Sequence, residues 1–82
     1  MEFHTIKSVK TLSNMILEVE FNNGINKIYD IKKILNKYEV LKKLENEKIF
    51  NSVKVDKGGY GIIWDENIDL SSEEIWNNGE EI

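Results

Sequence analysis

Residues 60–76 decide the fold, and they read Tyr-Gly-Ile-Ile-Trp-Asp-Glu-Asn-Ile-Asp-Leu-Ser-Ser-Glu-Glu-Ile-Trp. Aromatic and β-branched residues dominate the first five positions, a composition that predicts a strand over residues 60–64. Ile62 and Trp64 share one face of this strand, and Ile63 lies on the other. Because both faces carry apolar side chains, we expect a central strand or a strand covered on both sides.

Turn-forming residues 65–67 end this strand, and a helix start follows them. Ser71 and Glu74 have the spacing of a capping box, in which the serine hydroxyl accepts from the Glu74 N–H and the glutamate carboxylate accepts from the Ser71 N–H. Leu70 before the cap and Ile75 at the fourth helical position are placed to form a hydrophobic staple. The stretch therefore predicts a strand, a turn and a short helix in that order.

The chain before this stretch shows the period-two patterning of strands. The clearest example is residues 15–21, where Leu17, Val19 and Phe21 share a face. Glycine-containing turns, which tolerate a positive φ, are expected to join the strands into two hairpins. The expected strands cover residues 3–9, 15–21, 25–29 and 53–56, and the expected hairpin turns cover residues 22–24 and 57–59.

Two further segments carry helix signals. Asp30 is a good N-cap, and the apolar residues after it recur at helical spacing along residues 31–38, with Tyr38 the last on that face. Asn46 is placed to cap another short helical turn. These elements predict one α+β domain over residues 1–82, built from a small antiparallel sheet of two β-hairpins with two to three short helices.

The composition excludes several kinds of site. The 82 residues include no cysteine, which excludes disulfides and thiolate metal sites. All 11 basic residues are lysines, which leaves no guanidinium fork for bidentate phosphate or guanine contacts. No apolar run approaches the length of a membrane span, and the N-terminus lacks the apolar centre of a signal peptide. We therefore expect a cytoplasmic protein that neither enters a membrane nor binds nucleic acid directly.

Charge is unevenly distributed along the chain. Residues 1–57 hold 11 lysines and 8 acidic residues, whereas residues 58–82 hold 7 acidic residues and no lysine. An acidic C-terminal third can attract a basic partner, expected to be another small protein. For the charge distribution itself we favour the other interpretation, in which Glu73 and Glu74 serve the helix dipole and residues 77–82 are a solvated acidic tail.

No catalytic arrangement is evident in the sequence. His4 is the sole histidine and lies near the chain end, and no serine sits in a nucleophile-elbow motif. Asp56, Asp65 and Asp69 could form the site of a small metal-dependent hydrolase, but the spacing of a calcium-binding loop is absent. Acidic residues in such positions are ordinary turn formers. We expect no enzyme activity, no metal and no cofactor, and we keep the hydrolase as an alternative.

Trp64 is either a core residue or an interface anchor, since tryptophan is enriched at binding hot spots. A core as small as this one can hardly spare its largest side chain, so we favour the core. The same two alternatives hold for Trp76. The candidate partner-binding residues are Trp64, Asp65, Glu66, Asp69 and Glu73.

The chain resembles, over residues 5–76, a bacterial domain-of-unknown-function family numbered 2442. The resemblance rests on Leu17-Glu18-Val19-Glu20-Phe21, Asn23-Gly24, Tyr29-Asp30, Leu41 to Leu44, Ile49-Phe50 with Val53 to Asp56, Gly59, Ile63-Trp64 and Ile68-Asp69-Leu70. Family members typically have Trp-Pro-Asn-Gly before the Asp-Leu pair, whereas the turn after Trp64 lacks that proline and glycine. The departure affects the exact form of the turn, but the strand before it and the helix after it are still expected.

The resemblance implies a small α+β domain with no established catalytic residues. For some members it also implies a gene beside that of another small uncharacterised domain, in a toxin–antitoxin-like arrangement. We therefore expect a non-enzymatic protein-interaction module, one half of a toxin–antitoxin-like two-protein system. One alternative is a mobile-element protein that inhibits a nucleic-acid enzyme through an acidic surface, and the other is the metal-dependent hydrolase.

Overall fold

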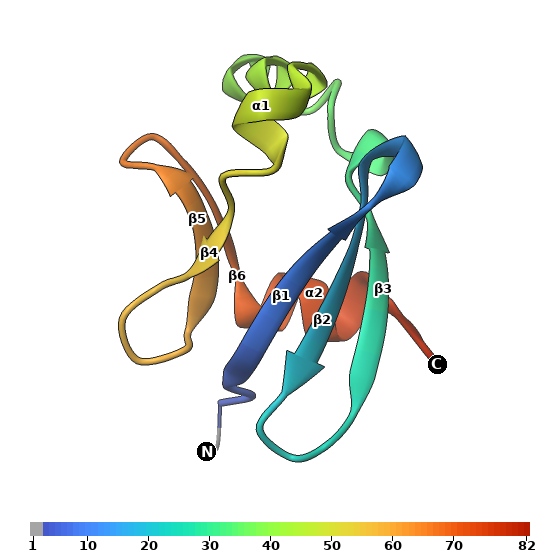
Figure 1. Ribbon diagram of the computed structural model, residues 1–82. Helices are drawn as coiled ribbons and strands as arrows, with labels where there is room; N and C mark the ends of the chain where they lie inside the picture. The colour runs from blue at the N-terminus through green and yellow to red at the C-terminus, as the bar shows by residue number, and fades with distance from the viewer. Residues whose placement is uncertain (1–2) are drawn as a thin grey trace.

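The computed structural model describes residues 3–82, which form two antiparallel sheets and several short helices (Figure 1). One sheet has the strand order β1-β2-β3-β7, and the other has the order β4-β5-β6. The α+β class predicted from the sequence is confirmed, and the two predicted hairpins lie in separate sheets. The strands are β1 (Ile6–Leu12), β2 (Ile16–Phe21), β3 (Asn26–Asp30), β4 (Lys54–Val55), β5 (Gly61–Asp65), β6 (Ile68–Ser71) and β7 (Glu80–Glu81). The helices are the 3₁₀ turns η1 (Ser13–Met15), η2 (Ile31–Lys33) and η3 (Glu39–Glu45) and the α-helices α1 (Glu47–Phe50) and α2 (Ser72–Asn78).

The four-stranded sheet buries one face of β2, as its alternating sequence predicts. Leu17, Val19 and Phe21 are almost fully buried, and the residues between them are partly exposed. The turn from β2 to β3 places Gly24 at a φ of +89°, a conformation that glycine adopts without steric cost. Figure 1 shows α2 crossing behind this sheet, on the side where the buried residues gather.

The prediction of a first strand over residues 3–9 is wrong at both ends. β1 covers Ile6–Leu12, and the connection to β2 is the 3₁₀ turn η1. Asn14 and Met15 both have a positive φ there, near 60°. Asn14 is an ordinary turn residue that tolerates this conformation, whereas Met15 carries no such signal, so the sequence indicates the turn but not its second left-handed residue.

The helix predicted over residues 31–38 is wrong in type and length. Asp30 does act as the N-cap, since its carboxylate accepts from the Lys32 N–H at 2.9 Å, but only the 3₁₀ turn η2 follows. Ile31 and Ile34 are buried, whereas Tyr38 is 59% exposed. η2 ends at Lys33, and Tyr38 lies beyond it in the connection to η3, so the helical spacing does not determine the face on which Tyr38 lies.

The stretch over residues 65–67 is a turn, as predicted, but the chain does not pass directly from it into a helix. Ile68–Ser71 returns along β5 as strand β6, which makes β5 the central strand of its sheet. Gly61 in β5 permits this close pairing, because a side chain there would lie 2.5 Å from the Leu70 carbonyl oxygen. The four residues of β6 are too few for their alternation to stand out in the sequence.

α2 ends at Gly79 through close packing and not through a left-handed conformation. Gly79 has a φ of −82°, and a Cβ at this position would lie 2.7 Å from the Ile75 carbonyl oxygen. The next residues form β7 against β3, with Ile28 opposite Glu80. Part of the segment expected to be an acidic tail is therefore paired into the first sheet.

Trp64 belongs to the hydrophobic core, as favoured from the sequence. Its side chain is 7% exposed, and its Nε1 donates a hydrogen bond of 3.0 Å to the Phe50 carbonyl oxygen. The same core contains Ile75 and the packed side chain of Leu70, the two residues expected to form the staple. No helix within residues 3–82 is long and apolar enough to cross a membrane.

Candidate functional site

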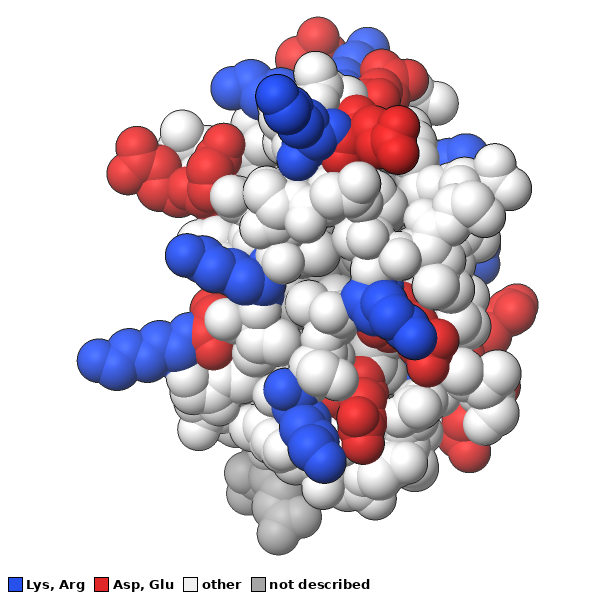
Figure 2. Space-filling model, viewed as in Figure 1, with Lys and Arg blue, Asp and Glu red and all other residues white. Residues whose placement is uncertain are grey.

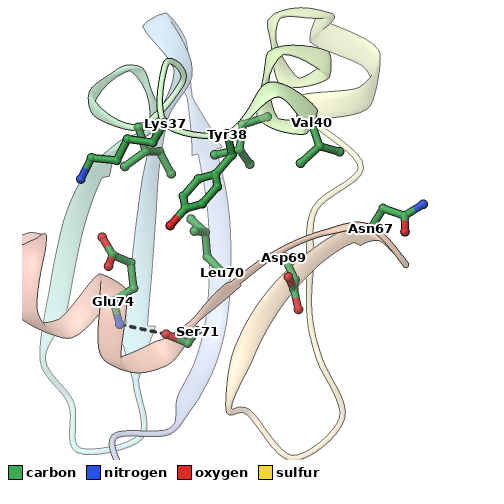
Figure 3. A pocket seen from close by; sticks show the side chains of 10 residues that line it. Lys37, Tyr38, Val40, Asn67, Asp69, Leu70, Ser71 and Glu74 are labelled. Atoms are coloured by element: carbon green, nitrogen blue, oxygen red, sulfur yellow. Dashed lines mark hydrogen bonds between the residues drawn. The ribbon is translucent and has the colours of Figure 1, made fainter.

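A cleft of about 390 Å³ lies between the connection that follows η2 and the β6–α2 segment. Ile34, Leu41 and Leu70 are the aliphatic side chains that line it, together with Val40. Its polar lining comes from Lys37 and Tyr38 on one side and from Asn67, Asp69, Ser71 and Glu74 on the other. Figure 3 shows the Tyr38 ring reaching down from the connection and the Glu74 side chain rising from α2 toward it. We call this set of residues the cleft.

Glu74 forms only half of the predicted capping box. The Ser71 hydroxyl accepts from the Glu74 N–H at 3.1 Å, as expected, and this bond is drawn in Figure 3. The Glu74 carboxylate, however, accepts from the Tyr29 hydroxyl at 2.7 Å and so turns away from the Ser71 N–H. Burial, and after it the hydrogen bond and negative charge of Glu74, raise the pKa of Tyr29 well above its usual range.

The edge of the second sheet runs along the cleft. β6 is an outer strand, and the Ser72 N–H bonds to the Tyr60 carbonyl oxygen at 2.8 Å. In an antiparallel pair, hydrogen-bonded and non-hydrogen-bonded residue pairs alternate. Because Ser72 bonds to Tyr60, the next bonded pair is Leu70 with Ile62, and the N–H and C=O of Leu70 face β5. The N–H and C=O of Asp69 and the N–H of Ser71 consequently point outward, and no residue within 3–82 bonds to them.

The structure does not bring the five predicted partner-binding residues onto one surface. Asp65, Glu66 and Asp69 are exposed on the β5–β6 hairpin, and Figure 2 shows acidic side chains gathered over the tip of that hairpin. Trp64 lies beneath them in the core. Glu73 lies on α2, where its carboxylate accepts from the His4 N–H at 2.8 Å.

Glu73 takes part in a separate cluster that attaches the N-terminal segment to α2. The His4 ring stacks on Trp76 at 3.8 Å between centroids, and its Nδ1 lies 3.0 Å from the Glu73 carboxylate. Phe21 meets the Trp76 ring edge-on at 5.0 Å, and the Lys27 ammonium lies 4.4 Å from its centroid. The hydrogen bonds from His4 lower the pKa of Glu73 more than its desolvation raises it. Trp76 is therefore a packed residue, covered by a histidine, a phenylalanine and a lysine.

The three carboxylates considered for a metal site serve local backbone roles or stand alone. Asp56 accepts from the Tyr60 N–H at 3.1 Å, and Asp65 accepts from the Asn67 N–H at 2.8 Å. Asp69 lines the cleft. Within residues 3–82 no three His, Cys, Asp or Glu side chains are grouped closely enough to hold a metal ion.

Sequence reasoning missed Lys37 and Tyr38 as site residues. The helical spacing assigned Tyr38 to an apolar face, and the structure exposes it at the cleft. The available signal was its polar neighbours, because Asn36, Lys37 and Glu39 surround the one aromatic residue. A large side chain isolated in a polar run is typical of a surface position.

Comparison with known protein families identifies the family of the chain but gives no activity. The model of the family described as "Protein of unknown function (DUF2442)" matches residues 6–81, nearly the whole chain, which confirms the resemblance seen in the sequence. No curated protein and no solved structure matches the chain.

Proposed function

We propose that this chain, which belongs to the DUF2442 family of proteins of unknown function, is a non-enzymatic module that binds another small protein in the cleft. The observation that carries the proposal is the placement of Tyr38. This side chain is 59% exposed, and Figure 3 shows its ring directed toward Glu74 beside the aliphatic lining of the cleft. A tyrosine in such a position offers a large contact area with little conformational entropy to lose.

The lining of the cleft favours a partner that is both apolar and basic. Leu41 and Leu70 supply apolar surface, and tyrosine is among the residue types enriched at protein interfaces. Glu74 supplies one carboxylate to the cleft and Asp69 a second on the other side of β6, against one ammonium group from Lys37. Complementary charge would steer a lysine- or arginine-containing segment to this side of the molecule.

The neighbouring-gene arrangement implied by the family resemblance gives the first candidate partner. In this proposal the chain and the product of the neighbouring gene form a toxin–antitoxin-like pair, and the cleft holds the partner. Exposed acidic residues on the β5–β6 hairpin, Asp65 and Glu66, would add a salt-dependent contribution to the association rate.

Two matched tyrosine variants test the proposal. The tagged chain is co-expressed with the products of the neighbouring genes and purified at physiological salt, and the partner's affinity is then measured by calorimetry. Tyr38→Ala should weaken binding by at least about tenfold, as for an interface anchor. Tyr60→Ala removes a tyrosine of similar exposure, 56%, that packs against Phe3 and not in the cleft.

The outcomes test separately whether the chain binds a partner and whether the cleft is the binding site. Loss of binding in Tyr38→Ala with normal binding in Tyr60→Ala supports both. The reverse result would keep the binding module and reject the cleft. If no partner is retained with any of the neighbouring gene products, the proposed function is wrong.

A further inference from the structure

We propose that the outer edge of β6 receives an extended segment of the partner as a fourth strand of the β4-β5-β6 sheet, and that this segment alternates basic and apolar side chains. The inference rests on the proposed function and specifies how the cleft holds its partner. Addition of a strand to an exposed sheet edge is a recurring way to bind a peptide, with backbone bonds giving affinity and side-chain pockets giving specificity.

Three backbone groups on this edge have no bonding partner within residues 3–82: the Asp69 N–H, the Asp69 C=O and the Ser71 N–H. The Ser71 C=O is not among them, because the carbonyl of an N-cap residue accepts the first bond of its helix. A residue placed opposite Asp69 can exchange two hydrogen bonds with it, and a residue two positions away can accept the Ser71 N–H. Three such bonds would fix the register of an added strand.

The failed half of the capping box keeps the Ser71 N–H free. In the predicted box the Glu74 carboxylate would accept from this N–H. In the structure that carboxylate bonds to the Tyr29 hydroxyl at 2.7 Å. Tyr29 on β3 therefore holds Glu74 away from the edge and leaves a donor exposed beside the cleft.

The side chains of β6 define what the added segment carries. Figure 3 shows Leu70 directed into the cleft and Asp69 directed to the opposite side of the strand. Residues opposite each other in paired strands share a face, so the residue opposite Leu70 meets the aliphatic floor and the Tyr38 ring. The residue opposite Asp69 meets a carboxylate. A segment with an apolar residue opposite Leu70 and a lysine or arginine opposite Asp69 therefore matches both faces of β6.

The cleft has room for a short strand. A neighbouring strand lies about 4.8 Å from the edge it pairs with, and the hollow alongside β6 measures about 390 Å³. This volume falls within the range of roughly 300–1,000 Å³ that is typical of ligand sites. Tyr38 on the far side would close over the apolar side chain of the inserted segment.

Charge argues for a partner segment over a second copy of this chain. β6 lies within residues 58–82, which hold 7 acidic residues and no lysine. Pairing of two β6 edges would bring Asp69 and Glu74 of one copy near the same residues of the other. Like charges directly across paired strands are destabilising, whereas a basic segment is attracted.

Hydrogen exchange on selected peptides gives the first test. Random octapeptides are selected by phage display against the purified protein, and an enriched peptide is synthesised and added to isotope-labelled protein. We expect enriched sequences to alternate basic and apolar residues. The Asp69 and Ser71 amides should exchange at least about tenfold more slowly with peptide, while the Leu70 amide, already bonded to β5, should not change.

A proline variant gives the second test. Asp69→Pro deletes the outward N–H and the carboxylate, and proline is tolerated in an edge strand where its missing N–H faces outward. Asp69→Asn removes the charge and keeps the N–H. Asp69→Pro should weaken peptide binding about tenfold, and Asp69→Asn about threefold with a smaller salt dependence. Far-ultraviolet circular dichroism and tryptophan emission matching those of the unmodified protein establish that both variants are folded.

Each alternative outcome overturns the inference in a recognisable way. Peptides without the alternation, or protection away from Asp69 and Ser71, would exclude strand addition at β6. Protection of the two amides that grows with protein concentration in the absence of peptide would identify a second copy as the occupant. Failure to select any peptide also counts against the inference.

The inference and the proposed function fail separately. If the partner is lost in Tyr38→Ala but binds Asp69→Pro normally, the module stands and strand addition is wrong. If selected peptides protect the two amides but none of the neighbouring gene products binds, the edge is a peptide site and the proposed partner is wrong.

Discussion

The hydroxyl of Tyr29 donates a hydrogen bond of 2.7 Å to the carboxylate of Glu74, across 45 positions of sequence. The bond joins β3 of the first sheet to the first turn of α2. Tyr29 is 2% exposed, whereas Glu74 lies at the cleft. A buried residue of the core therefore sets the direction of a side chain at the candidate site.

Tyr29→Phe should lower the free energy of unfolding by about 1 kcal/mol at neutral pH, the usual contribution of one hydrogen bond. Urea unfolding followed by tryptophan fluorescence measures the change. Tyr60→Phe is the control, because its exposed hydroxyl makes no such bond to a carboxylate. Equal stability of Tyr29→Phe and the unmodified protein would show that Glu74 finds another donor at no cost.

The same tyrosine gives the protein a distinctive alkaline behaviour. The pKa of Tyr29 is raised in the folded state, so above pH 10 the unfolded chain loses this proton while the folded chain keeps it. The contribution of Tyr29 to stability should then be constant below about pH 10, the ordinary pKa of tyrosine, and should be lost as the pH rises further. Tyr29→Phe should show a shallower fall between pH 9 and pH 11. An identical alkaline slope in the two proteins would contradict the assignment.

Glu73→Gln should change the acid side of the stability curve. The folded-state pKa of Glu73 is lowered by its bonds to His4, so its contribution is present above its ordinary value of 4.5 and is lost as the pH falls below that value. Thermal midpoints of Glu73→Gln and the unmodified protein should differ at pH 6 and converge by pH 3. Glu66→Gln is the control, because Glu66 lies on the exposed β5–β6 hairpin and not on α2.

Trp64→Ala should largely unfold the protein. Removing a buried tryptophan costs about 3–5 kcal/mol, and a domain of this size has only about 5 kcal/mol or slightly more to lose. Circular dichroism would show loss of the sheet signal. A folded Trp64→Ala protein of near-normal stability would contradict the core position of this side chain.

Divalent metals should not bind at the aspartates proposed for the alternative hydrolase. Within residues 3–82 no three His, Cys, Asp or Glu side chains are grouped closely enough to surround a cation, and a hard cation such as calcium needs several oxygen ligands. Titration with calcium, magnesium, manganese and zinc, followed by tryptophan emission, to which Trp64 next to Asp65 contributes, should give no saturable change. A saturable response that is lost in Asp65→Asn would revive the hydrolase.

Sequence alone determined the elements whose signals lie within a few residues of one another. Asp30, Asn46 and Ser71 each cap the turn that their type and position predict, because a cap bonds to an N–H only two or three residues away. The alternation of β2 predicted its buried face for a similar reason, since side chains two positions apart share a face of the strand. The burial of Trp64 followed from its size in a small core.

Tertiary structure decided what depends on residues far apart in the chain. The two-residue strand β7 forms because the chain leaving α2 lies beside β3. The four-residue strand β6 can pair closely with β5 because Gly61 has no side chain. Tertiary contacts also determined the partner of the Glu74 carboxylate. It accepts from the buried Tyr29 hydroxyl and not from the nearby Ser71 N–H, because the folded sheet places Tyr29 within hydrogen-bonding distance. The position of the Glu74 side chain and the exposure of Tyr38 together shape the cleft. Tyr38 is exposed because the 3₁₀ turn η2 ends before it, and the apolar spacing of the preceding residues does not determine its position.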